Sequence, residues 1–251
     1  MKIISWNVNG LRSIYRKGFI ELLERENFDI VCLQEIKAKK EQLSFDFLGP
    51  KGYVSIYNSA ERPGYSGVAV YSKIKPDKVG RKLGFSRFDN EGRILKLDFK
   101  NFSLINVYIP HGARDKRNLD YKLEAYNHLS KEIEKLKDEN VILMGDFNIA
   151  HRKIDLARPE GNMNNTMFTE NERKQIDDII NLGFIDTFRE FNDEGGHYSW
   201  WPYRVDARKR NVGWRIDYIF VSKDLLPRLG DAFILSKVKG SDHCPVGIEI
   251  A

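Results

Sequence analysis

Short apolar runs, rich in β-branched and aromatic residues, recur along the whole chain and constrain its fold more than any other feature. Several of them are continuously apolar instead of alternating with polar residues, which is typical of strands buried on both faces. We therefore predict β-strands over residues 2–8, 29–36, 54–57, 67–71, 94–99, 102–109, 141–147, 214–221, 231–237 and 246–250.

Helical patterns separate some of these runs. A helix is predicted over about 115–138, because apolar residues recur there at spacings of three and four. These residues are Leu119, Leu123, Tyr126, Leu129, Ile133 and Leu136. Residues 169–172 (TENE) are typical of a capping box that opens a second helix, with Gly183 near its end. A third helix is predicted over about 12–27.

Many strands with interspersed helices indicate an α/β fold in which two sheets pack face to face and helices cover the outside. At 251 residues and 41% hydrophobic, the chain has enough apolar material to bury a large core. No Pro/Ser-rich linker, low-complexity tract or shift in composition divides it. We therefore expect one domain over residues 1–251.

The net charge and the two cysteines bear on the type of binding partner and on the redox compartment of the protein. Lys and Arg total 41 against 36 for Asp and Glu, giving a net charge of +5. This excess suits a polyanionic partner, although charge alone favours the simpler explanation of a slightly basic surface. Cys32 and Cys244 lie far apart in apolar segments and are interpreted as core residues in a reducing compartment.

The sequence shows no targeting or membrane segment. Its N-terminus lacks the apolar core of a signal peptide, and no apolar run approaches the roughly 20 residues that a membrane helix needs. The protein is therefore expected to be soluble and cytoplasmic, or nucleoid-associated in a prokaryote.

Polar residues interrupt the apolar runs at five places where a predicted strand ends or begins. A buried carboxylate, amide or imidazole costs several kcal/mol unless it finds a partner. Each interruption alone has an ordinary explanation as a turn residue, a cap, a surface charge or a core histidine. Five together at strand ends indicate a functional site. They are residues 6–10, 33–35, 106–110, 145–148 and 240–245.

The residue types at these places suit a hard cation and a phosphate. Glu35, Asp146 and Asp242 supply oxygen ligands, which Mg²⁺ or Mn²⁺ prefers. Such a metal neutralises a phosphodiester oxygen and stabilises the leaving oxygen. His243 can hydrogen-bond the phosphate if a carboxylate fixes its tautomer, and Asp217 is the candidate for that carboxylate.

Asp146 and Asn148 stand two residues apart on what is predicted to be an extended segment. Side chains at this spacing project to the same side of a strand. One of them can then take a proton from the nucleophile while the other orients the water or the metal.

The interrupted segments form motifs that resemble the exonuclease III family of apurinic/apyrimidinic (AP) endonucleases. That family belongs to the endonuclease/exonuclease/phosphatase superfamily, which includes deoxyribonuclease I and inositol polyphosphate phosphatases. The resemblance implies a four-layer α/β-sandwich with two packed mixed β-sheets flanked by helices. The matching stretches are 6–11 (WNVNGL), 33–37 (LQEIK), 106–110, 145–151 (GDFNIAH), 154–156, 211–218 (NVGWRIDY) and 240–245 (GSDHCP).

The resemblance also implies roles for individual residues. Asp146 would activate the attacking water, Asn148 would orient it, and Asp217 would pair with His243. Tyr108 would approach the phosphate, either as a phenolate that helps the nucleophile or as a donor in the transition state. One or two Mg²⁺ ions, for which Mn²⁺ can substitute, would be held by Asn7, Glu35, Asp146, Asn148, Asp242 and His243.

Other residues match positions that contact the substrate in the family. The apolar pocket for a flipped-out, base-free sugar would consist of Trp200, Trp214 and Ile216. The DNA-binding residues would be Asn9, His111, Arg114, Asn162, Asn165, Arg204 and Trp214. His111 departs from the pattern, because many relatives carry Asn or Gln there. Arg204, Arg208, Lys209 and Arg210 lie among the aromatic residues of the pocket and suit a DNA backbone, or else form a solvated basic loop.

The implied function is Mg²⁺-dependent hydrolysis of the phosphodiester 5′ to abasic sites in double-stranded DNA, leaving a 3′-hydroxyl and a 5′-deoxyribose phosphate. Accompanying 3′→5′ exonuclease and 3′-phosphodiesterase activity on 3′-blocked ends is expected, as part of base excision repair. The enzyme is expected to act as a monomer, without an obligate protein partner and without binding membranes. Two alternatives are a superfamily phosphatase acting on inositol phosphates or lipid headgroups, and a catalytically silent DNA-binding module. The aromatic and basic segment over 198–216 disfavours the phosphatase, and the filled acidic and imidazole positions disfavour the silent module.

Overall fold

The computed structural model describes residues 1–43, 48–204 and 206–251, and their strands form two six-stranded sheets. The first sheet is ordered β11 (Leu229–Ile234), β12 (Val246–Ile250), β1 (Lys2–Asn7), β2 (Ile30–Gln34), β4 (Val68–Ser72) and β3 (Val54–Asn58). The second sheet is ordered β5 (Lys78–Gly80), β6 (Ile94–Phe99), β7 (Phe102–Tyr108), β8 (Val141–Asp146), β10 (Asp217–Ser222) and β9 (Phe184–Asp186). Both sheets are mixed, because β1 pairs in parallel with β2 and β7 with β8, whereas the other neighbours are antiparallel.

All ten predicted strands are present, with ends that differ from the prediction by a few residues. The strand predicted over 214–221 begins only at Asp217, because Trp214 instead forms isolated bridges with Leu156 and Trp200. The prediction missed β5 and β9, which are three residues long and therefore too short to show a pattern.

The predicted helices over 115–138 and after Thr169 correspond to α5 (Leu119–Glu134) and α6 (Glu170–Asn181). The capping box of α6 is confirmed: the Glu172 N–H donates to the Thr169 hydroxyl, and the Thr169 N–H donates to the Glu172 carboxylate. Four further short α-helices and four 3₁₀ helices are described. They are α1 (Leu11–Tyr15), α2 (Phe19–Glu26), α4 (Ser86–Asn90), α7 (Thr187–Phe191), η1 (Lys40–Gln42), η2 (Lys153–Asp155), η3 (Pro159–Asn162) and η4 (Lys223–Arg228).

The prediction of a single helix over 12–27 is wrong. Two helices, α1 and α2, occupy this segment, and Gly18 separates them with a φ of 90°. This left-handed conformation is accessible to glycine and cannot continue a right-handed helix.

Among the described helices, none combines the length and the apolar character needed to cross a membrane.

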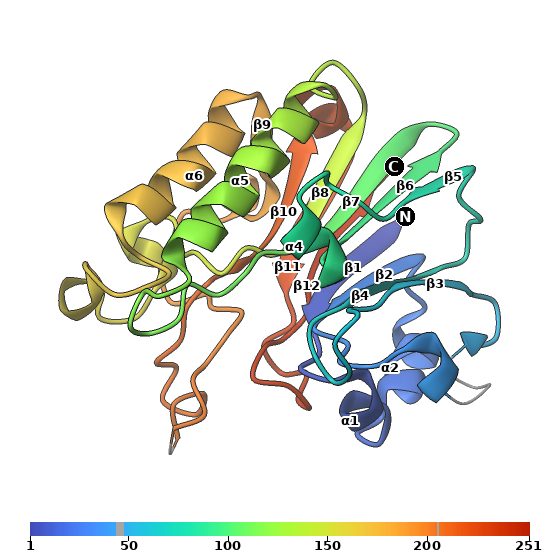
Figure 1. The fold of residues 1–251 in the computed structure, drawn as a ribbon, viewed down its shortest axis with the longest axis horizontal. Helices are drawn as coiled ribbons and strands as arrows, with labels where there is room; N and C mark the ends of the chain where they lie inside the picture. Colours follow the sequence, from blue (N-terminus) through green and yellow to red (C-terminus); the bar gives the residue numbers. More distant parts are fainter. Residues whose placement is uncertain (44–47, 205) are drawn as a thin grey trace.

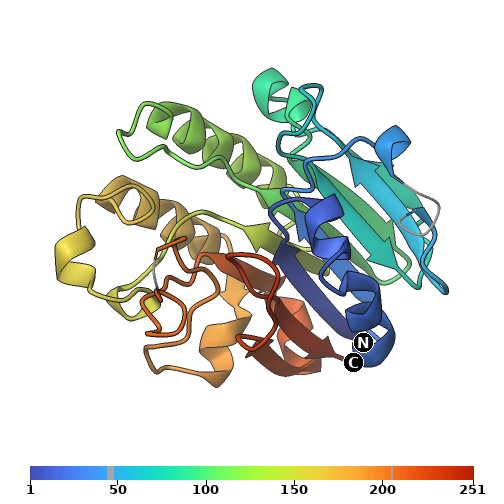
Figure 2. The ribbon, with the colours of Figure 1, turned by 90° about the horizontal axis from the view of Figure 1, so that it is seen from below.

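Four layers follow one another through the molecule, with a hydrophobic cluster between each pair (Figures 1 and 2). Helices α1 and α2 cover the outer face of the first sheet around Trp6 and Phe19. The two sheets pack on each other through residues such as Cys32 and Met144. Helices α5 and α6 cover the outer face of the second sheet, around Tyr126. The expected four-layer sandwich is thus confirmed.

Six segments meet at one edge of the two sheets. Strands β1, β2, β7 and β8 end there, whereas β10 and β12 begin there because they run antiparallel to β8 and β1. In the second sheet this brings Tyr108, Asp146 and Asp217 into one row across three neighbouring strands. The strand directions therefore gather the polar residues that interrupt the apolar runs.

A buried ion-pair network stabilises the chain behind this edge. The Arg215 guanidinium donates to Asp155 at 2.7 Å and to both oxygens of Asp186 at 3.0 and 2.7 Å. Arg189 also pairs with Asp155. Burial alone would raise the pKa of Asp155, but the charges of Arg215 and Arg189 lower that pKa to about 2.

The exchange Asp155→Asn is therefore expected to lower the free energy of unfolding by about 3 kcal/mol at pH 7, because it leaves Arg215 partly unpaired. The carboxylate's own contribution is full above its ordinary pKa of 3.8 and is lost as the pH falls through the folded value of about 2. Urea unfolding at pH 7 and between pH 4 and 2 should thus show a difference that shrinks with acid. The matched control is Asp193→Asn, an exchange at an exposed carboxylate, and it should change stability little. Equal effects of the two exchanges at pH 7 would contradict the prediction.

Candidate active site

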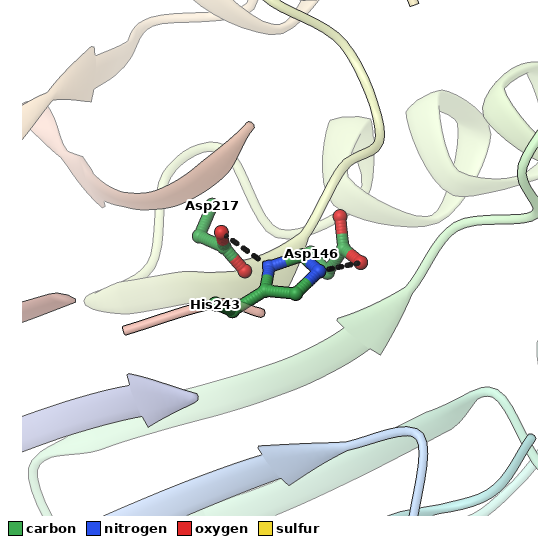
Figure 3. A group of neighbouring side chains, drawn as sticks. All are labelled: Asp146, Asp217 and His243. Atoms are coloured by element: carbon green, nitrogen blue, oxygen red, sulfur yellow. Dashed lines mark hydrogen bonds and ion pairs between the residues drawn. The ribbon is translucent and has the colours of Figure 1, made fainter. Parts of the chain in front are cut away.

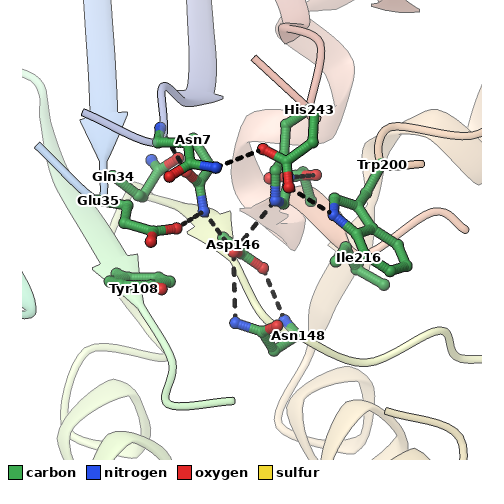
Figure 4. Close-up of polar contacts among 12 residues, drawn as sticks. Asn7, Gln34, Glu35, Tyr108, Asp146, Asn148, Trp200, Ile216 and His243 are labelled. Carbon is green, nitrogen blue, oxygen red and sulfur yellow. Dashed lines mark hydrogen bonds and ion pairs between the residues drawn. The ribbon is translucent and has the colours of Figure 1, made fainter. Parts of the chain in front are cut away.

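An amide from the first sheet links carboxylates from both sheets at the shared edge. Asn7 ends β1 and is 1% exposed, and its Nδ2 donates to Glu35 Oε2 at 3.0 Å and to Asp146 Oδ2 at 2.8 Å. Glu35 follows β2 directly with a φ of 56°, which turns the chain out of the strand. Figure 4 shows these side chains pointing toward one another.

Two buried amides lie beneath this contact and join the sheets. Gln34 Nε2 donates to Asn106 Oδ1 at 2.7 Å, and Asn106 Nδ2 donates to the carbonyls of Leu33 and Ala69 at 3.1 and 3.0 Å. The sequence analysis gave these residues no role. The signal was present, because each is a polar residue within a continuously apolar strand and needs a partner in the core.

His243 lies between two carboxylates of the second sheet. Its Nδ1 is 2.8 Å from Asp217 Oδ2, and its Nε2 is 3.9 Å from Asp146 Oδ2 (Figure 3). Burial alone would lower the pKa of His243, but Asp217, followed by Asp146, raises that pKa to about 10. Burial, and then the charge of Asp217, raises the pKa of Asp146 to about 7. The predicted pairing of Asp217 with His243 is present in the structure.

Asp242 occupies the opposite side of the site. Asn9 Nδ2 donates to Asp242 Oδ1 at 3.0 Å, and Trp200 Nε1 donates to Oδ2 at 3.1 Å. Burial raises the pKa of Asp242, but His243 and these two donors outweigh it and lower the pKa. Lys37, which the sequence analysis left without a role, donates to Asn9 Oδ1 at 2.5 Å and pairs with Glu35 at 2.8 Å.

The segment after β8 is a turn, so the prediction that Asp146 and Asn148 lie on an extended segment is wrong. Asn148 has a φ of 53°, and its N–H donates to Asp146 Oδ1 at 2.9 Å. The two side chains still meet, because Asn148 Nδ2 lies 3.3 Å from Asp146 Oδ2 and 2.9 Å from the Ile109 carbonyl. An asparagine is among the few residues that adopt this left-handed conformation readily.

Tyr108 lies next to Glu35 at the end of β7. Burial, and then the charge of Glu35, raises the pKa of the Tyr108 phenol, whereas Arg93 opposes the shift. The Arg93 guanidinium lies 4.5 Å from the centre of the Tyr108 ring and donates to the Tyr108 carbonyl at 3.0 Å. Arg93 is 3% exposed and pairs with Glu91. This support under the ring comes from the residue just before β6 and was not foreseen from the sequence.

The residues of the predicted sugar pocket lie together at the shared edge of the two sheets, beside His243. Trp200 and Trp214 pack edge to face with ring centres 6.4 Å apart, and Trp200 lies as close to the His243 ring. Trp214 and Ile216 are 9% and 1% exposed, so they form the back of this apolar cluster. Trp200 is half-buried and is the member that faces the site (Figure 4).

The remaining DNA-binding candidates, apart from Asn9, lie on segments around the site. The Ala113 N–H donates to His111 Nδ1 at 3.0 Å, which leaves the His111 Nε2 proton available to a ligand. Arg114 and Arg204 are exposed. Asn165 Nδ2 donates to Asn162 Oδ1 at 2.8 Å, so these amides hold each other.

The interpretation of Arg208 as a DNA contact is not favoured by the structure. Its guanidinium donates to the carbonyls of Ser241, Ser236 and Val238, and it lies 4.4 Å from the centre of the Trp201 ring. These contacts engage Arg208 in holding the loop before β12. The basic loop thus has one structural arginine in addition to the exposed Arg204, Lys209 and Arg210.

The donor set of the site fits a hard divalent cation. Asp146, Asp217 and His243 form a buried group whose ligand atoms lie within 4.8 Å of one another, and within it Asp217 and His243 are paired with each other. Asp217 Oδ1 is buried and has no hydrogen-bond partner within the described ranges. Around this group lie the carboxylates of Glu35 and Asp242, which accept from the amide nitrogens of Asn7 and Asn9, and both cysteines are buried in the core. Oxygen donors of this kind suit Mg²⁺ or Mn²⁺ rather than a metal that prefers sulfur.

Comparisons with known proteins agree with this arrangement. The Endonuclease/Exonuclease/phosphatase family matches residues 4–243. The chain is 44% identical over 253 residues to an exodeoxyribonuclease of Bacillus subtilis (strain 168), covering 100% of this chain and 99% of the relative. It is 39% identical over 255 residues to a DNA-(apurinic or apyrimidinic site) endonuclease of Dictyostelium discoideum, covering 100% of this chain and 70% of the relative.

A solved structure has the same fold. A 3′ phosphatase from Neisseria, bound to a product DNA hairpin, superimposes with a TM-score of 0.91 at 29% identity and covers 100% of this chain and 99% of its own. These similarities extend over the whole chain and include both sheets. The chain therefore belongs to the Endonuclease/Exonuclease/phosphatase family of hydrolases, and within it to the exodeoxyribonucleases and AP endonucleases that its motifs resemble.

Proposed function

We propose that this enzyme hydrolyses the phosphodiester bond 5′ to an abasic site in double-stranded DNA, leaving a 3′-hydroxyl and a 5′-deoxyribose phosphate. The observation that carries the proposal is the gathering of Glu35, Asp146 and His243 at one edge of the sheets, directly beside the half-buried face of Trp200. The proposed hydrolytic site and the apolar face of Trp200 thus lie next to each other. The name of the Dictyostelium relative supports the same substrate.

Mg²⁺, for which Mn²⁺ can substitute, is the proposed cofactor, as one or two ions. The residues proposed to hold it are Asn7, Glu35, Asp146, Asn148 and Asp242, which come from both sheets. When bound, the ion neutralises charge on the phosphate and stabilises the leaving oxygen.

The chain's own groups divide the remaining work. Asp146 accepts the proton of the attacking water at a carboxylate oxygen, and Asn148 orients that water with its amide. His243 donates from Nδ1 to Asp217 at 2.8 Å, and because its pKa is raised to about 10 it also carries a proton on Nε2, which is available to a phosphate oxygen. We therefore favour His243 as a hydrogen-bond donor over its expected role as a metal ligand. Tyr108 is the second donor to the phosphate, because burial raises the pKa of its phenol and keeps the hydroxyl protonated.

The surroundings support DNA as the substrate. The exposed cations Arg114 and Arg204 suit contacts with DNA phosphates, and the net charge of +5 has the matching sign. The base-free sugar is small and apolar on one face, which suits contact with the half-buried Trp200. Activity as a 3′→5′ exonuclease and on 3′-blocked ends, within base excision repair, is part of the proposal, as is action as a monomer without an obligate protein partner.

The direct test uses a duplex oligonucleotide with one tetrahydrofuran (THF) site, incubated with Mg²⁺ or with EDTA. We expect a nick on the 5′ side of the lesion with Mg²⁺ and none with EDTA. Intact and blunt-ended duplexes, a uracil duplex and inositol phosphates serve as comparisons. Absence of the Mg²⁺-dependent nick would remove the proposal, and faster release of phosphate from inositol phosphates would favour a phosphatase.

Removal of the Trp200 indole is expected to weaken recognition of the lesion. Trp200→Ala should raise KM for the THF duplex about 10-fold, because an aromatic contact of about 1 kcal/mol or more is lost. Trp200→Phe is the matched control, since it keeps an aromatic face and loses only the N–H donated to Asp242. Steady-state kinetics on THF and intact 3′-end substrates compare the two variants. Unchanged preference for the THF duplex in Trp200→Ala would show that Trp200 does not line the sugar pocket.

A further inference from the structure

A fully buried ion pair lies directly behind the candidate active site. Lys122 on α5 and Glu172 in the first turn of α6 are both 0% exposed, and Lys122 Nζ is 2.6 Å from Glu172 Oε1. Taking two charges out of water is costly, and such a pair often contributes little net stability. Its placement therefore calls for a reason other than stability, and the further contacts of each partner supply one.

Lys122 contacts the catalytic turn itself. Its Nζ donates to the backbone carbonyl of Asn148 at 2.6 Å. The Asn148 N–H is held by Asp146 Oδ1 at 2.9 Å, and the side-chain Nδ2 by the Ile109 carbonyl at 2.9 Å. The ammonium thus fixes the one backbone group of Asn148 that these other contacts leave open, and with it the left-handed turn at a φ of 53°.

Glu172 connects the same turn to the segment that carries the DNA-binding candidates Asn162 and Asn165. Its carboxylate accepts from the Met167 N–H at 2.8 Å and from the Thr169 N–H at 3.1 Å. The Met167 carbonyl in turn accepts from the Ala150 N–H at 2.9 Å, two residues after Asn148. The carboxylate is therefore an anchor for both Lys122 and the loop at 162–169.

We propose that Lys122, anchored by Glu172, is a positioning residue for the hydrolysis: it holds the turn that aims the Asn148 side chain at the attacking water. The inference rests on the proposed function, since it assigns Asn148 to the reacting water. Lys122 itself is 0% exposed and touches no substrate, so its effect is exerted through the backbone of Asn148. A displacement of about 1 Å in such a group is enough to slow catalysis about 100-fold.

The test is the double variant Lys122→Met/Glu172→Gln, which removes both charges and keeps similar side-chain volumes. We expect kcat on the THF duplex to fall roughly 30- to 100-fold. The Kd for the same duplex in EDTA should stay within about threefold of the wild-type value, and thermal unfolding should remain cooperative. A drop confined to kcat separates positioning from a general weakening of the fold.

Two further variants complete the experiment. Lys122→Arg keeps a cation that can reach both the Asn148 carbonyl and Glu172, and should restore kcat to within about fivefold of wild type. Lys96→Met/Glu132→Gln removes an ion pair at the other end of α5, and should leave kcat unchanged. Wild-type-like kcat in the Lys122/Glu172 double variant, no rescue by arginine, or a loss of DNA affinity or folding equal to the loss of kcat would each overturn the inference. An inactive wild-type enzyme would instead contradict the proposed function.

Discussion

Asp146→Asn is expected to lower the rate of THF-duplex cleavage roughly 10⁴-fold while leaving DNA affinity within a fewfold of wild type. The exchange removes the group proposed to accept the water's proton and one negative charge from the metal site. It also disturbs the local contacts, because the Asn7 amide that donates to Asp146 Oδ2 at 2.8 Å would meet another amide there unless the new side chain turned around. DNA affinity should persist, since the exposed cations around the site are untouched.

The rate is measured in single-turnover experiments with saturating enzyme, and affinity by titration in EDTA. Glu35→Gln is the companion variant and should likewise abolish cutting, with a higher Mg²⁺ concentration needed for any residual activity. Asp138→Asn, an exposed exchange just before β8, controls for the loss of one charge. Full activity in both active-site variants would contradict the assignments of Asp146 and Glu35.

The second large effect is expected at His243 and Asp217. His243→Gln should lower kcat roughly 10³-fold, because it removes the donor proposed to stabilise charge on the phosphate. Asp217→Asn should lower kcat nearly as much, since Asp217 holds His243 Nδ1 at 2.8 Å and is the largest cause of the rise in the pKa of His243.

The two residues are expected to act as one unit. The double variant His243→Gln/Asp217→Asn should therefore be about as slow as His243→Gln alone. Kinetics on the THF duplex for the wild type, both single variants and the double variant give the coupling. Independent, multiplicative losses would mean that Asp217 does not work through His243.

Much of the fold was predictable because buried strands and amphipathic helices each leave a pattern in the local sequence. The continuously apolar runs around Ile3, Leu143 and Phe220 became inner strands of the two sheets. The capping box at Thr169 marked the start of α6. Strands β5 and β9 were not predictable, because each has three residues and is defined by its pairing partner. The break at Gly18 depends on a backbone angle that periodicity does not reveal.

The residues of the candidate site were predictable as a set, because polar groups at the ends of buried strands need partners and the strand directions bring them to one edge. Their supports were not. Arg93 under Tyr108 and Lys122 behind Asn148 come from other elements, and nothing in their local sequence points to these contacts. The turn at Asn148 was missed because an extended segment explains a spacing of two residues equally well.

A crystal of the wild-type protein soaked in Mn²⁺ and measured for anomalous scattering addresses the metal directly. We expect a strong peak in the space between Glu35 and Asp146, within bonding distance of their carboxylate oxygens. Peaks found only elsewhere on the protein, with these two carboxylates free of metal, would contradict the assignment of this edge of the sheets as a metal-dependent active site.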